Sequence, residues 1–175
     1  MIITRFAPSP NGPLHWGHAY SAIIAHDLAR EAGGKFLLRI EDIDGPRSRP
    51  ELADEFRRDL EWLGLEWEEV PAQGTRLASY EAALERLDAM GVLYPCTCTR
   101  AEIAAAASET GPEGPVYPGT CRPTLGQATI FDMEIVPQVN WRFRVPDGET
   151  VAFEDGRFGS QSFVAGSDFG DFVLW

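Results

Sequence analysis

The sequence contains almost no lysine and no long hydrophobic run. Only Lys35 among its 15 basic residues is a lysine, and 27 acidic residues bring the net charge to −12. This negative charge argues against general, salt-driven binding to nucleic acid. No stretch approaches the roughly 18 consecutive apolar residues that cross a bilayer. The residues after Met1 show neither a basic segment nor a cleavage site, so we expect a cytoplasmic protein.

The charge is unevenly distributed along the chain. Residues 1–50 carry a net charge of +1, whereas residues 51–91 carry −7 and residues 92–175 carry −6. A polyanionic substrate is therefore expected to make a few local contacts near the amino-terminal segment rather than to cover a broad basic face.

The hydrophobic pattern predicts an α/β fold. Residues 2–6 and 36–40 are short apolar runs typical of strands, and residues 17–32 between them have helical periodicity. Such a unit implies a parallel pair of strands with a right-handed crossover. Capping-box spacing predicts helix starts at Ser48 and Thr99.

The last third of the sequence has a different pattern. Residues 139–145 alternate apolar and polar side chains, and Pro146-Asp147-Gly148 then offers a turn into residues 151–153. This spacing predicts that the two segments pair as a β-hairpin.

The most informative segment is the loop between the first predicted strand and helix, which ends in His15, Gly17 and His18. A helix amino terminus favours anions, and histidines three residues apart lie on one side, where they can donate to phosphate oxygens. Gly17 lets a nucleotide approach the backbone. The alternative is that His15 caps the helix and His18 is solvated. A zinc pair is disfavoured because no cysteine or carboxylate partner is near.

The three cysteines form a second candidate site. An odd number of cysteines without a secretion signal argues against a disulfide framework. Cys96 and Cys98 share one face of an extended segment, which suits two ligands of one ion, and Cys121 offers a third thiolate. Tyr117, Glu113 and water remain open as the fourth ligand. The competing interpretation is three reduced, partly buried thiols.

Three sequence blocks resemble those of one enzyme family. Arg5 to His18 resembles the first signature of glutamyl-type class I aminoacyl-tRNA synthetases, Leu37 to Asp44 a second block, and Gly170 to Leu174 a third. The resemblance spans nearly the whole chain. It implies a Rossmann-like class I catalytic core with a zinc-binding insertion.

The same resemblance implies a division of the chain and a role for each motif. Residues 1–91 would form the amino-terminal half of the catalytic domain, 92–135 the insertion, and 136–175 a β-rich segment leading back. Glutamate would be held by Arg5, Phe6, Ala7, Pro8, Ser9 and Glu41. ATP would be held by Pro8, His15, Gly17 and His18, with the two histidines as catalytic residues.

A guanidinium at Arg5 suits bidentate recognition of a carboxylate, and Glu41 suits an ammonium group. The carboxyl ends of parallel strands are where ligands gather in such sheets, and both residues are predicted there. Without the resemblance, Arg39, Glu41, Asp42 and Asp44 would be interpreted as a surface charge cluster.

The cysteine pattern is similar to that of the glutamyl-queuosine tRNA(Asp) synthetases, whose zinc is held by two cysteines, a tyrosine and a third cysteine. The ligands implied here are Cys96, Cys98, Tyr117 and Cys121, around one structural Zn²⁺ per chain. The segment from Ala19 to Ala22 also favours this branch.

The implied substrates are L-glutamate, ATP with Mg²⁺, and tRNA(Asp) carrying queuosine. We expect a monomer without a membrane partner. An ordinary glutamyl-tRNA synthetase fragment is the second hypothesis. A nucleotidyltransferase acting on a small metabolite and a non-catalytic, zinc-stabilised tRNA-binding module are less favoured.

One family signature is not found. Class I synthetases also carry a lysine-containing loop that stabilises the triphosphate, whereas Lys35 is interpreted as a solvent-facing turn residue. We therefore expect these 175 residues alone to bind ATP weakly and not to turn over.

Overall fold

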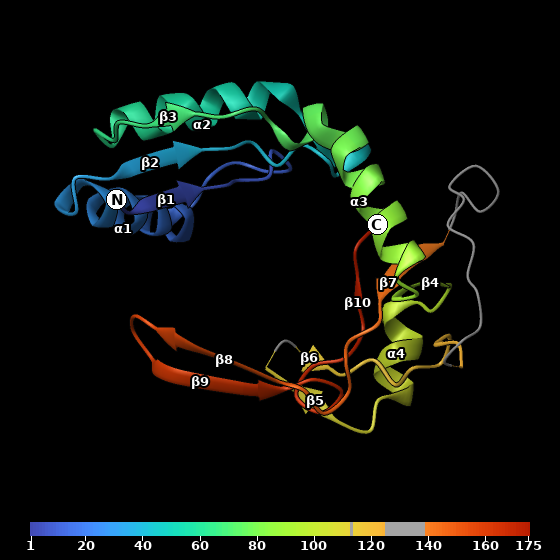
Figure 1. The fold of residues 1–175 in the computed structure, drawn as a ribbon. Coiled ribbons are helices and arrows are strands. Elements are labelled where there is room, and N and C mark those ends of the chain that lie inside the picture. The colour runs from blue at the N-terminus through green and yellow to red at the C-terminus, as the bar shows by residue number, and fades with distance from the viewer. Residues whose placement is uncertain (113, 125–138) are drawn as a thin grey trace. The chain divides into compact units, whose positions relative to one another are not determined.

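The computed structural model describes residues 1–112, 114–124 and 139–175. The chain divides into two compact units, residues 1–80 and residues 81–175, whose elements are labelled in Figure 1. Within the described residues, no helix combines the length and the apolar character that a bilayer crossing requires.

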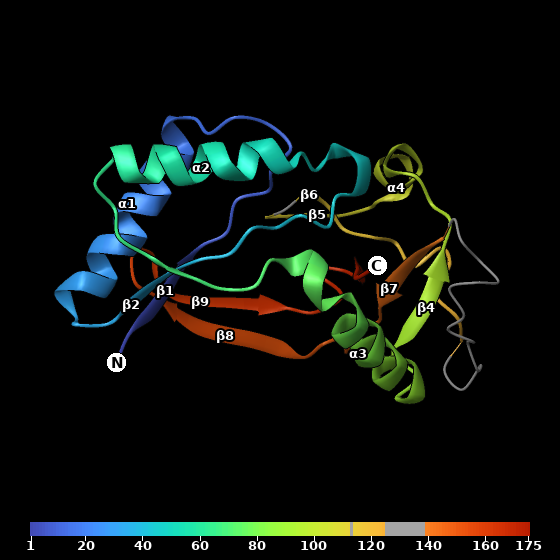
Figure 2. The same cartoon turned by 90° about the horizontal axis from the view of Figure 1, so that it is seen from above.

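The first unit is a three-stranded parallel sheet of order β1-β2-β3. Figure 2 shows helices α1 and α2 on the same side of its strands. The elements in chain order are β1 (Ile3–Phe6), α1 (Trp16–Glu31), β2 (Lys35–Leu38), the 3-10 helix η1 (Gly45–Arg47), α2 (Pro50–Trp62), β3 (Glu68–Glu69) and the 3-10 helix η2 (Gln73–Arg76). The predicted parallel strand, helix, strand unit is confirmed, whereas β3 was not predicted.

The core of this unit lies between the sheet and its two helices. Its members include the buried side chains of Phe6, Phe36, Leu38, Phe56 and Leu60. The Thr4 hydroxyl donates to the Ala25 carbonyl at 2.6 Å, which ties β1 to α1. Because side chains alternate along a strand, Thr4 and Phe6 face the helices, whereas Arg5 lies on the opposite face and is exposed.

The helix start predicted at Ser48 is wrong. Helix α2 begins at Pro50 with Arg49 as its N-cap, and no side chain accepts a capping hydrogen bond there. Ser48 instead ends η1, where its backbone N–H donates to the Gly45 carbonyl. The helix thus starts one residue later than the box requires.

Gly34 marks a close approach between the end of α1 and the start of β1. A Cβ at this position would lie 1.9 Å from the Ile2 carbonyl oxygen, which accepts the Lys35 N–H at 2.9 Å. We expect Gly34→Ala to lower the free energy of unfolding by about 3 kcal/mol, because the backbone must shift. Gly12→Ala, whose Cβ would meet nothing within 4 Å, should change it by less than about 0.5 kcal/mol. Equal urea midpoints for the two variants would contradict this prediction.

The described residues of the second unit form a three-stranded antiparallel sheet of order β10-β7-β4 and two two-stranded antiparallel sheets. Helix α3 (Leu77–Ala89) leads into it, and Gly91, two residues after the helix ends, reverses the chain direction with a φ of 70°. The other elements are β4 (Leu93–Cys96), α4 (Arg100–Ala106), β5 (Thr110–Gly111), β6 (Gly114–Pro115), β7 (Asn140–Phe143), β8 (Thr150–Asp155), β9 (Gly159–Val164) and β10 (Phe172–Val173). The capping box predicted at Thr99 is confirmed.

The two faces of the β10-β7-β4 sheet have different surroundings. On one face Leu93 and Trp141 pack against Leu84 of α3. The other face carries Tyr94, Cys96 and Arg142, because Tyr94 lies opposite Arg142 in the ladder and side chains alternate. This second face packs against the other two cysteines, Cys98 and Cys121.

The hairpin predicted between residues 139–145 and 151–153 is wrong. Strand β7 pairs with β4 and β10, and β8 pairs with β9 instead. The Val145 N–H donates to the Asp171 carboxylate at 2.9 Å instead of to a neighbouring strand. The chain therefore leaves the sheet before the turn at Gly148. The actual hairpin turn follows Asp155, whose Oδ1 accepts the N–H groups of Arg157 and Phe158.

Candidate functional site

The loop after β1 lies beside the residues that follow β2. The Glu41 N–H donates to the Pro8 carbonyl at 3.0 Å, and the Arg39 N–H donates to the Phe6 carbonyl at 3.1 Å. These contacts continue the parallel pairing of β1 and β2 beyond the strands themselves. Of the predicted group of Arg5 to Ser9 and Glu41, Pro8 and Glu41 are therefore direct neighbours at the carboxyl edge of the sheet, whereas Arg5 lies within β1 opposite Leu37.

The Glu41 carboxylate is held from two sides. Arg39 Nε donates to Oε1 at 2.7 Å, and Gln73 Nε2 donates to Oε2 at 2.6 Å. The Glu41 side chain retains 19% exposure. A carboxylate can accept about four hydrogen bonds, so Glu41 keeps acceptor capacity for a ligand.

Sequence reasoning missed the segment that supports this carboxylate. Gln73 begins η2, and the neighbouring Gly74 N–H donates to Asp42 Oδ1 at 2.6 Å. Both contacts join residues 32 positions apart, so no local sequence pattern predicts them. The Gln73 side-chain oxygen is buried without a hydrogen-bond partner within the described part of the chain.

The two histidines of the loop motif cap helix α1. The Gly17 N–H donates to His15 Nδ1 at 3.1 Å, and the His15 N–H donates to His18 Nδ1 at 3.3 Å. The two rings stack with their centroids 3.9 Å apart. The cap interpretation of His15 is therefore confirmed, and the pair lies on one side of the helix start as predicted.

This capping arrangement also fixes the chemistry that the rings can offer. A neutral imidazole whose Nδ1 accepts a hydrogen bond carries its proton on Nε2. Burial and the adjacent His15 lower the pKa of His18, which favours the neutral ring. His15 and His18 can therefore both present Nε2–H donors while their Nδ1 atoms hold the helix start.

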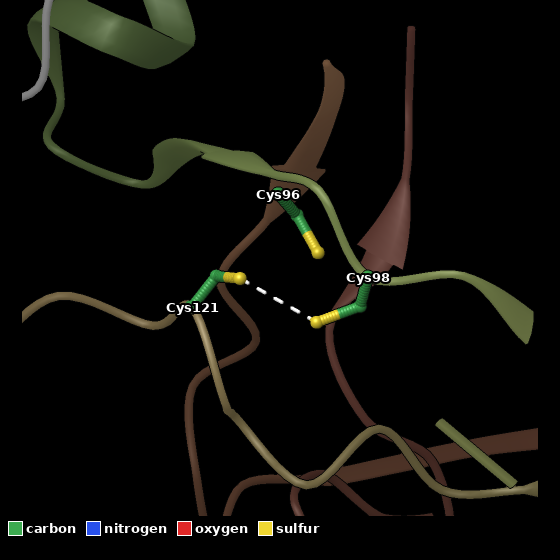
Figure 3. A group of neighbouring side chains, drawn as sticks. All are labelled: Cys96, Cys98 and Cys121. Carbon is green, nitrogen blue, oxygen red and sulfur yellow. Dashed lines mark hydrogen bonds between the residues drawn. The ribbon is translucent and has the colours of Figure 1, made fainter. Parts of the chain in front are cut away.

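The three cysteines converge in the second unit, as Figure 3 shows. Their sulfur atoms all lie within 4.8 Å of one another, and Cys98 Sγ lies 3.5 Å from Cys121 Sγ. Strand β4 ends at Cys96, and Cys98 lies directly before Thr99, the N-cap of helix α4. The sequence prediction that these thiols gather at one point is confirmed.

Tyr117 completes the group. Its hydroxyl oxygen lies 3.4 Å from Cys96 Sγ and 3.9 Å from Cys98 Sγ, and it accepts the Cys121 N–H at 2.8 Å. Glu113, the competing fourth ligand, lies outside the described residues. Ligands of a tetrahedral zinc ion with Zn–S bonds of about 2.3 Å are roughly 3.8 Å apart. The observed separations therefore fit one Zn²⁺ among these four side chains.

The pKa values of three members of the group shift in different directions. Burial raises the pKa of Cys98 above its ordinary value. Burial acts in the same direction on Cys121, but hydrogen bonds from the Thr97 backbone and from Cys98 lower the pKa of Cys121 to about 7. Burial and the contact with Cys96 raise the pKa of Tyr117, so the tyrosine is a neutral phenol before a metal binds.

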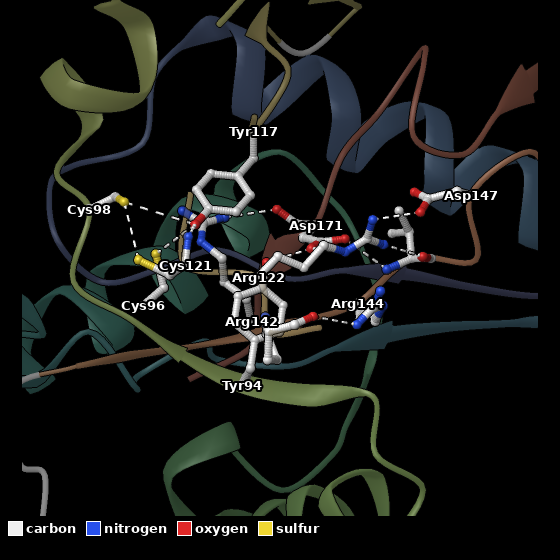
Figure 4. A network of polar contacts seen from close by, with 12 residues as sticks. Tyr94, Cys96, Cys98, Tyr117, Cys121, Arg122, Arg142, Arg144, Asp147 and Asp171 are labelled. Carbon is white, nitrogen blue, oxygen red and sulfur yellow. Dashed lines mark hydrogen bonds and ion pairs between the residues drawn. The ribbon is translucent and has the colours of Figure 1, made fainter. Parts of the chain in front are cut away.

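A buried polar network adjoins the cysteines, as Figure 4 shows. Asp171 is its centre: the carboxylate pairs with Arg122 Nε at 2.9 Å and also accepts the hydroxyl of Tyr94. Arg122 follows Cys121 directly in the sequence and also pairs with Asp147 at 2.6 Å. The network therefore connects the loop of the third cysteine to the segment that enters β10.

The chain matches the family model described as tRNA synthetases class I (E and Q), catalytic domain, over residues 1–165. A glutamyl-Q tRNA(Asp) synthetase from Rhodobacter capsulatus is 54% identical over 73% of this chain and 50% of its own length. A protein of the same name from Symbiobacterium thermophilum is 47% identical over 99% of this chain and 57% of its own length. The chain thus spans about half the length of the curated relatives it matches.

The fold is also similar to that of solved structures. The crystal structure of a glutamate-tRNA synthetase from Elizabethkingia anophelis superposes with a TM-score of 0.73 at 25% identity. That superposition covers 99% of this chain and 38% of the other. The architecture of the described elements is therefore one that a tRNA synthetase of known structure shares.

Proposed function

Because the chain belongs to the family of class I tRNA synthetases (E and Q), represented by their catalytic domain, we propose that the complete protein activates L-glutamate with ATP. The proposed acceptor is the queuosine base of tRNA(Asp). Its support is the name of the relatives at 47–54% identity, together with the cysteine and tyrosine pattern.

One observation carries the proposal for glutamate. Pro8 and Glu41 are hydrogen-bonded neighbours at the carboxyl ends of β1 and β2. In the proposed complex, Glu41 accepts the substrate's ammonium group, and the exposed Arg5 binds its side-chain carboxylate. Arg39 and Gln73 fix the direction of the Glu41 carboxylate and so reduce the cost of ordering it on binding.

The proposed ATP site is the start of α1. Pro8 and Gly17 allow the nucleotide to approach the backbone, and His15 and His18 donate from Nε2 to phosphate oxygens. The α-carboxylate of glutamate attacks the α-phosphorus of ATP, so that a mixed anhydride forms and pyrophosphate leaves. No general base is needed, because the nucleophile is already ionised and the site acts through position and charge. Mg²⁺ would supply neutralisation of the phosphate charge.

The proposed metal centre has a structural role. Cys96, Cys98, Tyr117 and Cys121 would hold one Zn²⁺, and closed four-coordination leaves no position for a substrate. The bound ion would join the end of β4 to the loop at Cys121 and so stabilise an insertion at residues 92–135 of a Rossmann-like core.

Glutamate-dependent exchange of pyrophosphate with ATP tests the proposed activity. The assay requires the protein at the full length of its relatives, because the present chain covers about half of them. We expect exchange with L-glutamate and none with L-aspartate. The shorter side chain of aspartate would not bring its carboxylate within reach of Arg5. A zinc-stabilised tRNA-binding module would show no exchange with either amino acid, and that result would refute the proposal.

A further inference from the structure

Arg142 of β7 lies directly beside the proposed metal ligand Tyr117. Its guanidinium carbon is 4.0 Å from the centroid of the Tyr117 ring, and the residue is only 6% exposed. Figure 4 shows Arg142 beside Tyr117 and hydrogen-bonded to Asp171. Sequence reasoning gave this arginine no role beyond the alternation of a strand.

The Arg142 guanidinium contacts both the Tyr117 ring and the backbone of Asp171. Its Nη1 donates to the backbone carbonyl of Asp171 at 2.8 Å, whereas the Asp171 carboxylate binds Arg122, Tyr94 and the Val145 N–H. Arg142 Nε is buried without a hydrogen-bond partner in the described part of the chain. A buried cation over an aromatic ring is stabilised by that ring, and the ring is held in turn.

The proposed metal centre requires a nearby positive charge and a fixed orientation of the Tyr117 ring, and Arg142 supplies both. Three thiolates and a tyrosine oxygen around one Zn²⁺ leave a net negative charge, which is costly in a buried site without a nearby cation. The Tyr117 oxygen must also point at the sulfur atoms, and a planar guanidinium stacked on the ring restricts the ring's orientation.

We propose that Arg142 is a positioning residue of the metal centre, which orients Tyr117 toward the three thiolates and offsets their negative charge. The inference rests on the metal site proposed above. It assigns to the β7 strand a part in metal binding, although β7 contributes no ligand. The register of β7 with β4 is what brings Arg142 to the ligand face, opposite Tyr94.

Competition with a chromogenic chelator measures the zinc affinity of the purified protein. We expect Arg142→Met to weaken it about 10–100-fold, in the range that outer residues of zinc sites contribute. Arg142→Lys, which keeps the charge but not the planar stack, should fall between the wild type and Arg142→Met. Arg144→Met is the matched control on the same chain segment, because Arg144 donates to the Pro123 carbonyl and should leave the affinity within about twofold.

A double-mutant cycle separates this role from a general effect on folding. If Arg142 orients Tyr117, adding Arg142→Met or Arg142→Lys to Tyr117→Phe should cause a smaller further loss of affinity than the same change causes in the wild type, and the remaining loss reports the charge of Arg142. If Arg142→Met does not fold, the double-mutant cycle with Arg142→Lys and Tyr117→Phe gives the same test. The visible spectrum of the Co²⁺ form should change in Arg142→Met as it does in Tyr117→Phe.

Two results would overturn the inference: unchanged affinity in both Arg142 variants, or losses that add fully to that of Tyr117→Phe. Failure of the wild-type protein to bind Zn²⁺ would instead refute the metal site itself. The two failures are therefore distinguishable.

Discussion

Replacing Cys98 with serine should abolish stoichiometric zinc binding and destabilise the second unit. Cys98 Sγ is 3.5 Å from Cys121 Sγ and 3.9 Å from the Tyr117 oxygen, so it lies centrally among the proposed ligands. Metal binding to zinc-finger peptides contributes about 10–16 kcal/mol to their folded state. The second unit also has an apolar cluster around Trp141, so we expect a smaller loss, of at least several kcal/mol.

Elemental analysis and denaturant unfolding together check this prediction. The wild-type protein should contain about one equivalent of zinc per chain, and Cys98→Ser should contain almost none. Thr97→Ala is the control, because Thr97 is exposed and its backbone contact with Cys121 remains. Substantially less than one equivalent in the wild type would contradict the metal site.

Replacing Glu41 with glutamine should reduce kcat/KM for glutamate by about 100-fold or more. Loss of one partner of a hydrogen-bonded charge pair at a binding site costs about 2–5 kcal/mol. The change should be seen mainly in the KM for glutamate, because Glu41 is proposed to contact the amino acid and not ATP. The measurement is pyrophosphate exchange in the protein at the full length of its relatives.

Asp44→Asn is the matched control for this variant. Asp44 belongs to the same acidic block but accepts a hydrogen bond from Asn11 at 3.2 Å, away from Glu41's partners. Its kcat/KM should stay within about twofold of the wild type. An equal rise of KM for ATP and for glutamate in Glu41→Gln would contradict the assigned role, since it would indicate general damage to the site.

The local part of the fold was predictable from sequence. The β1, α1 and β2 elements follow from periodicities within 40 residues, and the Thr99 capping box depends on only four residues. The pairing of β7 was not predictable, because it is decided by contacts with β4 and β10 that lie far away in the sequence. Strand β9 was missed because Gly159, Ser160 and Gln161 give it no apolar signal at its start.

The candidate site divides in the same way. All cysteines of the chain lie in one short window, so their convergence was expected, and the resemblance supplied Tyr117. Gln73 and Arg142 were missed, because each contacts a proposed ligand-binding residue at least 25 positions away in the sequence. Residue type alone does not distinguish a buried arginine over a tyrosine ring from a surface arginine on an edge strand.

Identifying the tRNA that accepts the glutamate is the most direct test of the proposed function. In the presence of ATP, the protein at the full length of its relatives should attach labelled glutamate to tRNA(Asp) that carries queuosine. It should transfer none to the same tRNA without queuosine or to unmodified tRNA(Glu). Transfer to tRNA(Glu) but not to queuosine-containing tRNA(Asp) would contradict the account and would identify an ordinary glutamyl-tRNA synthetase.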